Sequence, residues 1–150
     1  MAADPNKLTD PERVRNLMKN AEKVGETGLV TACRRRLLEL SGVDEADPLD
    51  RRLWQAVAAL EETLREKHGR AQVAGYTRRK IKDAGAVATL TDWAMKPKET
   101  PGFVALVAAG MAEFTGEYVI AQFPDRFQKH VVEAAQARLV EHGVALPTPA

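Results

Sequence analysis

The stretch "PLDRRLWQAVAALEETLREKHG", residues 48–69, is the longest helical pattern in the chain. Its apolar residues recur at helical spacing and form one stripe, which consists of Leu53, Trp54, Val57, Leu60 and Leu64. Gly69 follows the last charged turn, in the position where glycine commonly ends a helix. The stretch therefore predicts a long amphipathic helix, preceded by the polar loop "VDEADPLD".

Two further helical patterns come before this stretch. "TDPERVRNLMKNAEKVG" has Asp10 as its N-cap and Pro11 at the first helical position, and it ends at Gly25. "TGLVTACRRRLLELSG" continues to Gly42 with Cys33 on its apolar side. Its three consecutive arginines, residues 34–36, should fan around the helix because neighbours are about 100° apart. These patterns predict a helical hairpin.

Short helices are expected in the rest of the chain. They cover residues 77–84, 86–96, 101–109, 116–123 and 125–142, with glycine or proline at their ends. The run Tyr118, Val119, Ile120 is also compatible with a short strand, but we prefer a helix because its neighbours are all helical. The predicted fold is all-α, with seven or eight short helices: helical hairpins followed by a compact helical C-terminal half.

The expected domain organisation is simple. Residues 1–9 are predicted to be a disordered N-terminus, residues 10–143 a single helical domain with a candidate internal boundary near 43–49, and residues 144–150 a flexible tail. The 150 residues are 45% hydrophobic and 29% charged, which is typical of a soluble globular protein. A single cysteine, no apolar signal region and no long apolar run favour a cytoplasmic protein without a membrane span.

Candidate catalytic residues all have a structural explanation. Ser41 is the only serine and lies at a helix end, where it is expected to cap or turn the chain. Cys33 is expected to be a buried, inert thiol. Glu61 and Glu62 are expected to be solvated rather than a general acid and base. No phosphate-binding loop or dinucleotide fingerprint is present, so we predict no catalytic residues and no cofactor.

The histidines do not predict a metal site. His68 and His142 each precede a glycine at a predicted helix end, where a cation complements the helix dipole. His130 lies in the last helix and is expected at the surface. No two of them have the spacing of metal ligands.

The basic segment around Tyr76 is the most informative feature for function. Between Arg65 and Lys82 there are seven cations and one anion, a net charge of +6 in a chain whose total is +1. Four of these cations, Arg78, Arg79, Lys80 and Lys82, fall within five positions beside Tyr76 and Thr77. Clustered cations, a hydroxyl and a helix N-terminus are the groups that contact phosphates.

In this interpretation Thr77 is the N-cap of the basic helix, and Arg78 and Lys82 share a face at i, i+4. Ile81 would anchor the helix to the core. Cations outside the helix would widen the footprint, namely Lys67, Arg70, Lys96 and Lys98. The alternative is that the run is a solvated face, but no counter-charge is seen nearby in the sequence. The aromatic residues of the C-terminal half are expected in the core: Trp93, Phe103, Phe114, Tyr118, Phe123 and Phe127.

The segment from Tyr76 to Phe127 resembles a known type of module. An Arg-rich "TRxK" helix precedes a short hydrophobic helix, and a "GF..L...G" and "T.E.V....P..F" tail follows; the matching positions are Gly102, Phe103, Leu106, Gly110, Phe114, Thr115, Glu117, Val119, Pro124 and Phe127. The stretches at residues 13–25 and 47–70 also fit. This pattern resembles a small, uncharacterised, all-helical bacterial module associated with restriction-type nucleases or mobile DNA. Phe114 stands where a leucine or isoleucine is expected.

The sequence therefore predicts a non-enzymatic protein that binds duplex DNA through Arg70, Tyr76, Thr77, Arg78, Arg79, Lys80, Lys82, Lys96 and Lys98. The alternative is a protein–protein adaptor or homodimer. In that case the basic face would dock an acidic partner, and residues 102–110 and 113–123 would form part of the interface. A third interpretation, a small enzyme with an unfamiliar site, has no pattern that supports it.

Overall fold

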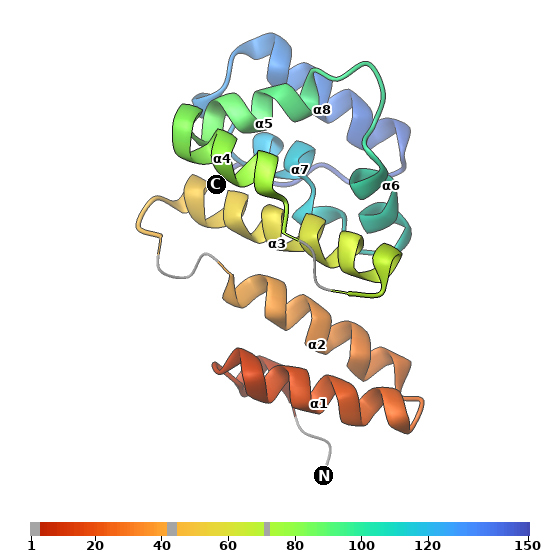
Figure 1. Cartoon of the computed structure of the whole chain (residues 1–150). Coiled ribbons are helices and arrows are strands. Elements are labelled where there is room, and N and C mark those ends of the chain that lie inside the picture. The colour runs from red at the N-terminus through yellow and green to blue at the C-terminus, as the bar shows by residue number, and fades with distance from the viewer. Residues whose placement is uncertain (1–3, 42–44, 71–72) are drawn as a thin grey trace.

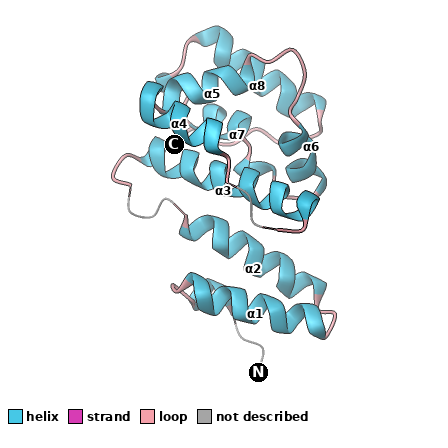
Figure 2. Ribbon diagram, in the orientation of Figure 1, coloured by secondary structure: helices cyan, strands magenta, loops and turns pink. Residues whose placement is uncertain are grey.

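The computed structural model describes residues 4–41, 45–70 and 73–150. Within these ranges the chain forms eight α-helices and no strand (Figures 1 and 2). This confirms the predicted all-α fold. The helices are α1 (Pro11–Lys23), α2 (Thr27–Leu40), α3 (Pro48–His68), α4 (Gly75–Ala84), α5 (Ala86–Ala94), α6 (Pro101–Ala108), α7 (Gly116–Gln122) and α8 (Lys129–Glu141). Three 3-10 turns lie at Pro5–Lys7, Ala112–Phe114 and Pro124–Arg126.

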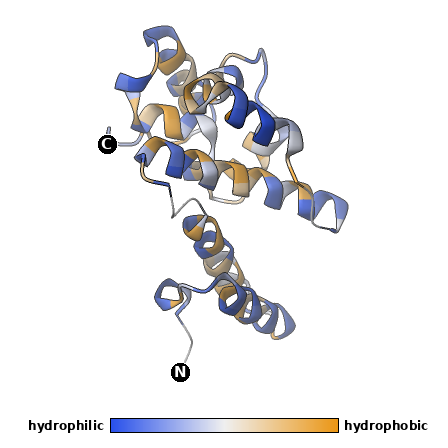
Figure 3. Cartoon of the chain, turned by 60° about the vertical axis from the view of Figure 1, so that its left-hand side comes forward, coloured by the Kyte–Doolittle hydropathy of each residue, from blue (hydrophilic) through white to orange (hydrophobic). Residues whose placement is uncertain are grey.

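Helices α1 and α2 form the predicted hairpin, which projects from one side of the remaining helices (Figures 1 and 3). The Asp10 side chain accepts a hydrogen bond from the Glu12 amide at 3.0 Å, which caps α1 as predicted. Between the helices, Val14, Met18 and Cys33 are buried against one another. The hairpin therefore has a small apolar core of its own.

Arginines of α2 tie this hairpin to the rest of the molecule. Arg34 Nη2 lies 2.9 Å from Glu66 Oε1 on α3, and Arg35 Nε lies 2.9 Å from Glu113 Oε1 in the turn before α7. Arg36 donates to a backbone carbonyl of the N-terminal segment. The three side chains thus fan out as predicted, and each has a structural partner in a different part of the fold.

Helix α3 runs through the centre and carries the main core. Its Leu49, Leu53 and Val57 are fully buried against residues of α5, α7 and α8. The Asp47 side chain caps its start by accepting from the Leu49 amide at 2.9 Å. Gly69 ends the helix in the left-handed conformation, at φ +71°. The predicted long helix is confirmed from its first residue to its last turn.

The C-terminal half packs α5, α7 and α8 around α3. Residues 118–120 are helical, which decides between the helix and the strand that the sequence left open. The aromatic residues predicted for the core are buried or partly buried there: Trp93, Phe103, Phe114, Tyr118, Phe123 and Phe127. Hydrophobic residues line the inner sides of the helices, as Figure 3 shows.

The last helix begins later than predicted. Residues 124–126 form a 3-10 turn and Phe127 is extended, so α8 starts at Lys129 rather than at Asp125. Pro124 explains this, because it favours the first position of a turn.

The segments at the chain ends and the candidate boundary are only partly described. In the N-terminal segment Pro5 is buried, and residues 1–3 lie outside the described ranges. In the C-terminal tail the Ala150 amide donates to the Gln122 carbonyl at 2.7 Å. The expected end of α2 at Gly42 and part of the candidate boundary at 43–49 also fall outside the described residues.

Gly116 provides a test of how tightly α5 and α7 pack. A Cβ at this position would lie 2.5 Å from Trp93 Cε3, so the ring covers the glycine backbone directly. We expect Gly116→Ala to lower the free energy of unfolding by about 1–3 kcal/mol, as overpacking does in other cores. Urea unfolding followed by circular dichroism measures the change.

Gly28→Ala is the matched control. Gly28 also lies in the first turn of a helix, but a Cβ there meets nothing within 4 Å. Its unfolding free energy should stay constant or rise slightly. Equal effects of the two substitutions would contradict the close packing of Trp93 on Gly116.

Candidate nucleic-acid interface

The basic helix α4 is amphipathic. It begins at Gly75, with Ala74 as its N-cap, and Gly85 ends it at φ +89°. Thr77 and Ile81 face inward, and Ile81 packs against the main core as predicted. Tyr76 lies about 100° around the helix from Thr77 and is 74% exposed.

The predicted role of Thr77 as N-cap is wrong. Thr77 lies inside the first turn of α4, and only 9% of it is exposed. No side chain caps α4. The helix starts two residues before Thr77. There the Ala74 amide donates a hydrogen bond to the Glu61 carboxylate of α3. The phosphate site expected at a Thr77-capped N-terminus is therefore not formed.

Arg78 is held by α3 rather than extended into solvent. Its Nε and Nη2 each donate to one carboxylate oxygen of Glu61 at 2.7 Å, which is the bidentate geometry of a strong charge-assisted pair. Its guanidinium also lies over the Trp54 ring, 5.4 Å from the centroid. Glu61, expected to be solvated, is instead the anchor for α4.

The same contacts set the protonation of the pair. Burial opposes ionisation of Glu61, but the hydrogen bonds from Arg78 and the Ala74 amide outweigh it and lower the pKa of Glu61. In return, the hydrogen bond to Glu61 raises the pKa of Arg78. Both groups are therefore charged at neutral pH.

Lys80 also has a partner. Its Nζ forms an ion pair with the Asp92 carboxylate on α5. The expectation that the basic run has no counter-charge within the protein is therefore wrong for Arg78 and Lys80. Both partners come from other helices, so neither is visible as a local pattern in the sequence.

Other cations remain exposed and form no ion pair with any residue that the structure describes. Arg79 and Lys82 lie on the outer side of α4, next to Tyr76. Arg65, Lys67 and Arg70 lie on the last turns of α3 and just after it. We call these five cations, Arg65, Lys67, Arg70, Arg79 and Lys82, the α3–α4 basic surface.

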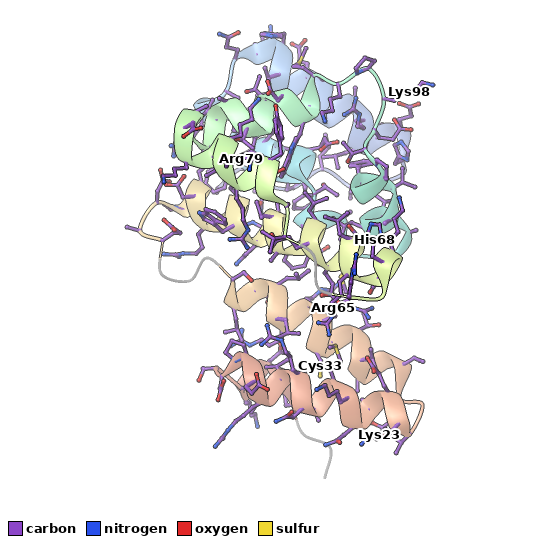
Figure 4. All side chains as sticks on the ribbon, in the orientation of Figure 1. Lys23, Cys33, Arg65, His68, Arg79 and Lys98 are labelled. Carbon is purple, nitrogen blue, oxygen red and sulfur yellow. The ribbon has the colours of Figure 1, made fainter. Side chains whose placement is uncertain are left out.

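The two parts of this surface lie on different helices, and Glu61 on α3 holds the start of α4. The Ala74 amide binds Glu61 at 2.8 Å, so the start of α4 lies against α3 at that residue. Arg65 is one helical turn beyond Glu61 on the same side of α3. Figure 4 shows Arg65 near the end of α3 and Arg79 on α4, well apart from each other in this view. Arg65 belongs to the surface although sequence reasoning did not include it among the site residues.

The two lysines after α5 lie elsewhere. Lys96 lines a cavity between the helices, and Lys98 follows in the loop before α6. Figure 4 shows Lys98 well away from Arg79. The structure therefore does not bring Lys96 and Lys98 to the α3–α4 basic surface.

The residues considered for catalysis have structural partners. The Ser41 hydroxyl donates to the Leu37 carbonyl at 3.2 Å, and burial raises the pKa of the Cys33 thiol. The His142 ring packs edge-on against Phe103, and its Nε2 lies 3.5 Å from Glu99. In the described segments, no group of His, Cys, Asp and Glu could hold a metal ion.

Comparisons with protein-family models, with curated proteins and with solved structures give no match to this chain. The resemblance of residues 76–127 to a nuclease-associated module stays a prediction. Among the residues that the structure describes, no helix has both the length and the apolar character needed to cross a membrane.

The structure separates two neighbouring arginines by role, and unfolding experiments can test this. Arg78→Ala removes both donors to Glu61 and uncovers Trp54, so it should destabilise the fold by about 1–2 kcal/mol, with partial exposure of Arg78 limiting the loss. Arg79→Ala, its exposed neighbour, should stay within about 0.5 kcal/mol of wild type. Equal losses would contradict the assignment.

The stability contributed by Glu61 should depend on pH. Its pKa is lower in the folded than in the unfolded protein, so the ionised group stabilises the fold above its unfolded value of about 4.3. That stabilisation is lost as pH falls through the lower folded value. The melting temperature of wild type should therefore drop more steeply than that of Glu61→Gln between about pH 5 and pH 3.

Thermal melts followed by circular dichroism at several pH values measure the difference. Glu141→Gln, at an exposed position at the end of α8, is the control and should follow the wild-type curve. A wild-type curve parallel to that of Glu61→Gln would show that Glu61 does not contribute in this way.

Proposed function

We propose that the protein is a non-enzymatic DNA-binding protein and that the α3–α4 basic surface contacts the phosphate backbone. The observation that supports this proposal is the set of five exposed cations that have no ion-pair partner among the described residues. Long cationic side chains at a surface are the groups that neutralise DNA phosphates and release their counterions.

The charge distribution favours an oriented approach to DNA. The total charge is only +1, so the concentration of cations between residues 65 and 82 leaves the rest of the chain acidic. A polarised protein turns its basic side toward a polyanion during encounter. Asp83 is the exposed anion on α4, while Glu66 at the end of α3 is paired with Arg34.

Each part of α4 has a separate task in this proposal. Arg79 and Lys82 contact phosphates, and the exposed Tyr76 ring packs on a sugar or a base. Arg78 and Lys80 are bound to Glu61 and Asp92, so they position the helix instead of contacting DNA. Of the four clustered cations of α4, the proposed DNA contacts therefore include Arg79 and Lys82 but not Arg78 and Lys80.

Fluorescence anisotropy of a labelled duplex, titrated at several salt concentrations, tests the proposal. If all five cations contact phosphates, the log–log salt dependence should have a slope of about −4 to −5. The variants Arg79→Gln/Lys82→Gln and Arg65→Gln/Lys67→Gln should each bind more weakly and make the slope shallower by about 2.

Lys19→Gln/Lys23→Gln provides a control with the same loss of charge. Both lysines are exposed on α1, and Figure 4 places Lys23 in the hairpin, far from Arg79. This variant should keep the wild-type slope. A control slope reduced as much as that of the surface variants would contradict a localised interface. Absence of binding at low salt would contradict DNA binding altogether.

The second candidate is a protein-interaction module, and one observation favours it. Helix α6 and its C-cap residue expose the small apolar residues Val104, Ala105, Ala108 and Ala109, with Val104 47% exposed. A contiguous patch of exposed apolar residues is typical of a surface that contacts another protein. The other segment expected at such an interface, residues 113–123, is mostly buried in the core. A protein that binds no duplex and elutes as a dimer would favour this candidate.

A further inference from the structure

A cavity of about 250 Å³ lies on the inner side of α4, between α3, α5, α6 and α7. Its walls are largely apolar and aromatic, with Trp93, Phe103 and Phe114 among them. The proposed DNA contacts do not use this cavity, because Arg79 and Lys82 lie on the outer side of α4. Small-molecule sites are concave and mostly apolar, with a few placed polar groups.

One polar group in the wall is the carboxylate of Glu117, of which only 4% is exposed. Its Oε2 accepts a hydrogen bond from Arg138 Nη1 at 3.3 Å. Arg138 is itself fixed by the Lys96 carbonyl at 2.6 Å and the Trp93 carbonyl at 3.3 Å. A carboxylate has about four acceptor positions, so one contact with Arg138 leaves capacity for a donor inside the cavity.

The second polar group is the Thr77 hydroxyl, which comes from α4. Thr77 is 9% exposed and lines the cavity. The other buried threonines are satisfied locally: Thr89 donates to the Gly85 carbonyl at 2.9 Å, and Thr115 to the Ala112 carbonyl at 2.7 Å. A hydroxyl in the wall of the cavity can donate a hydrogen bond to a molecule bound there.

We propose that this cavity binds a small, flat, uncharged aromatic molecule that carries an N–H donor and a ring nitrogen acceptor. The aromatic walls match a planar ring system, Glu117 accepts from the N–H, and the Thr77 hydroxyl donates to the ring nitrogen. Glu117 and Arg138 already balance each other's charge, so a neutral ligand avoids the cost of burying another ion. The volume limits the ligand to a bicyclic ring system or smaller.

Benzimidazole and indene are suitable probes because they have the same ring size, and only benzimidazole has the two nitrogens. Titration of the full chain, followed by ¹H–¹⁵N NMR, should shift the amides of Gly102 and Gly116, which line the cavity, and the Trp93 side-chain N–H. We expect benzimidazole to bind about 30-fold more tightly than indene, since each of the two hydrogen bonds contributes roughly 1 kcal/mol.

Thr77→Val keeps the shape of the side chain and removes the hydroxyl, so it should weaken benzimidazole binding about fivefold to tenfold and leave indene binding unchanged. Thr89→Val is the matched control: Thr89 is fully buried and helical but is not part of the cavity wall. It should bind both probes as wild type does. Glu117→Gln is the second variant, and it should weaken binding of benzimidazole more than of indene.

Either of two titration results would overturn the proposal. One is equal binding of benzimidazole and indene, and the other is no shift of the three reporter signals with either probe. Unchanged benzimidazole affinity in Thr77→Val would equally remove the assigned hydrogen bond. The Arg79→Gln/Lys82→Gln variant should bind benzimidazole normally, so this test stands or fails independently of DNA binding.

Discussion

The carboxylate of Glu61 is the contact on which the arrangement of α4 depends. It accepts two hydrogen bonds from Arg78 and one from the Ala74 amide, all between 2.7 and 2.8 Å. A backbone donor at the start of α4 and a side chain one turn later are thereby bound to one group on α3. This fixes both the position of the helix and its rotation about its axis. With the rotation fixed, Thr77 must face inward, and Arg79 must face solvent.

This contact also explains why the basic run does not act as a single patch. A half-buried carboxylate is stabilised only if a cation and a donor satisfy it, so Arg78 is required by the fold itself. Lys80 is used in the same way by Asp92. The fold thus pairs two of the four clustered cations with carboxylates of other helices and leaves two without an ion pair among the described residues. Other free cations come from α3, which no inspection of residues 76–82 alone would indicate.

The sequence was sufficient for those features that depend on neighbouring residues. The caps at Asp10, Thr100 and Thr115 act within three residues of themselves, and the αL glycines at the ends of α1 and α3 depend only on local backbone conformation. The apolar spacing of α3 likewise predicted its buried side. For these reasons the helix order and the all-α class were predictable.

Long-range pairing was not predictable in the same way. Arg78 and Glu61 are 17 residues apart, and Arg138 and Glu117 are 21 apart. Which carboxylate meets which guanidinium depends on how the helices dock, and the spacing along one helix does not contain that information. A signal was nonetheless present: Glu61 lies beside the apolar stripe at Leu60 and Leu64 rather than opposite it. A charged residue at the edge of a buried stripe commonly binds a partner from the next helix.

The two sides of α4 face different surroundings, although the residues on them are close in sequence. Thr77 is two residues from Arg79, yet one faces the cavity and the other faces solvent. The helix itself separates them, because its backbone groups are already hydrogen-bonded and its diameter is about 10 Å. A molecule in the cavity therefore cannot touch phosphates on the outside. Any influence between the two sites would have to pass through the position of α4, and the contacts with Glu61 resist its movement.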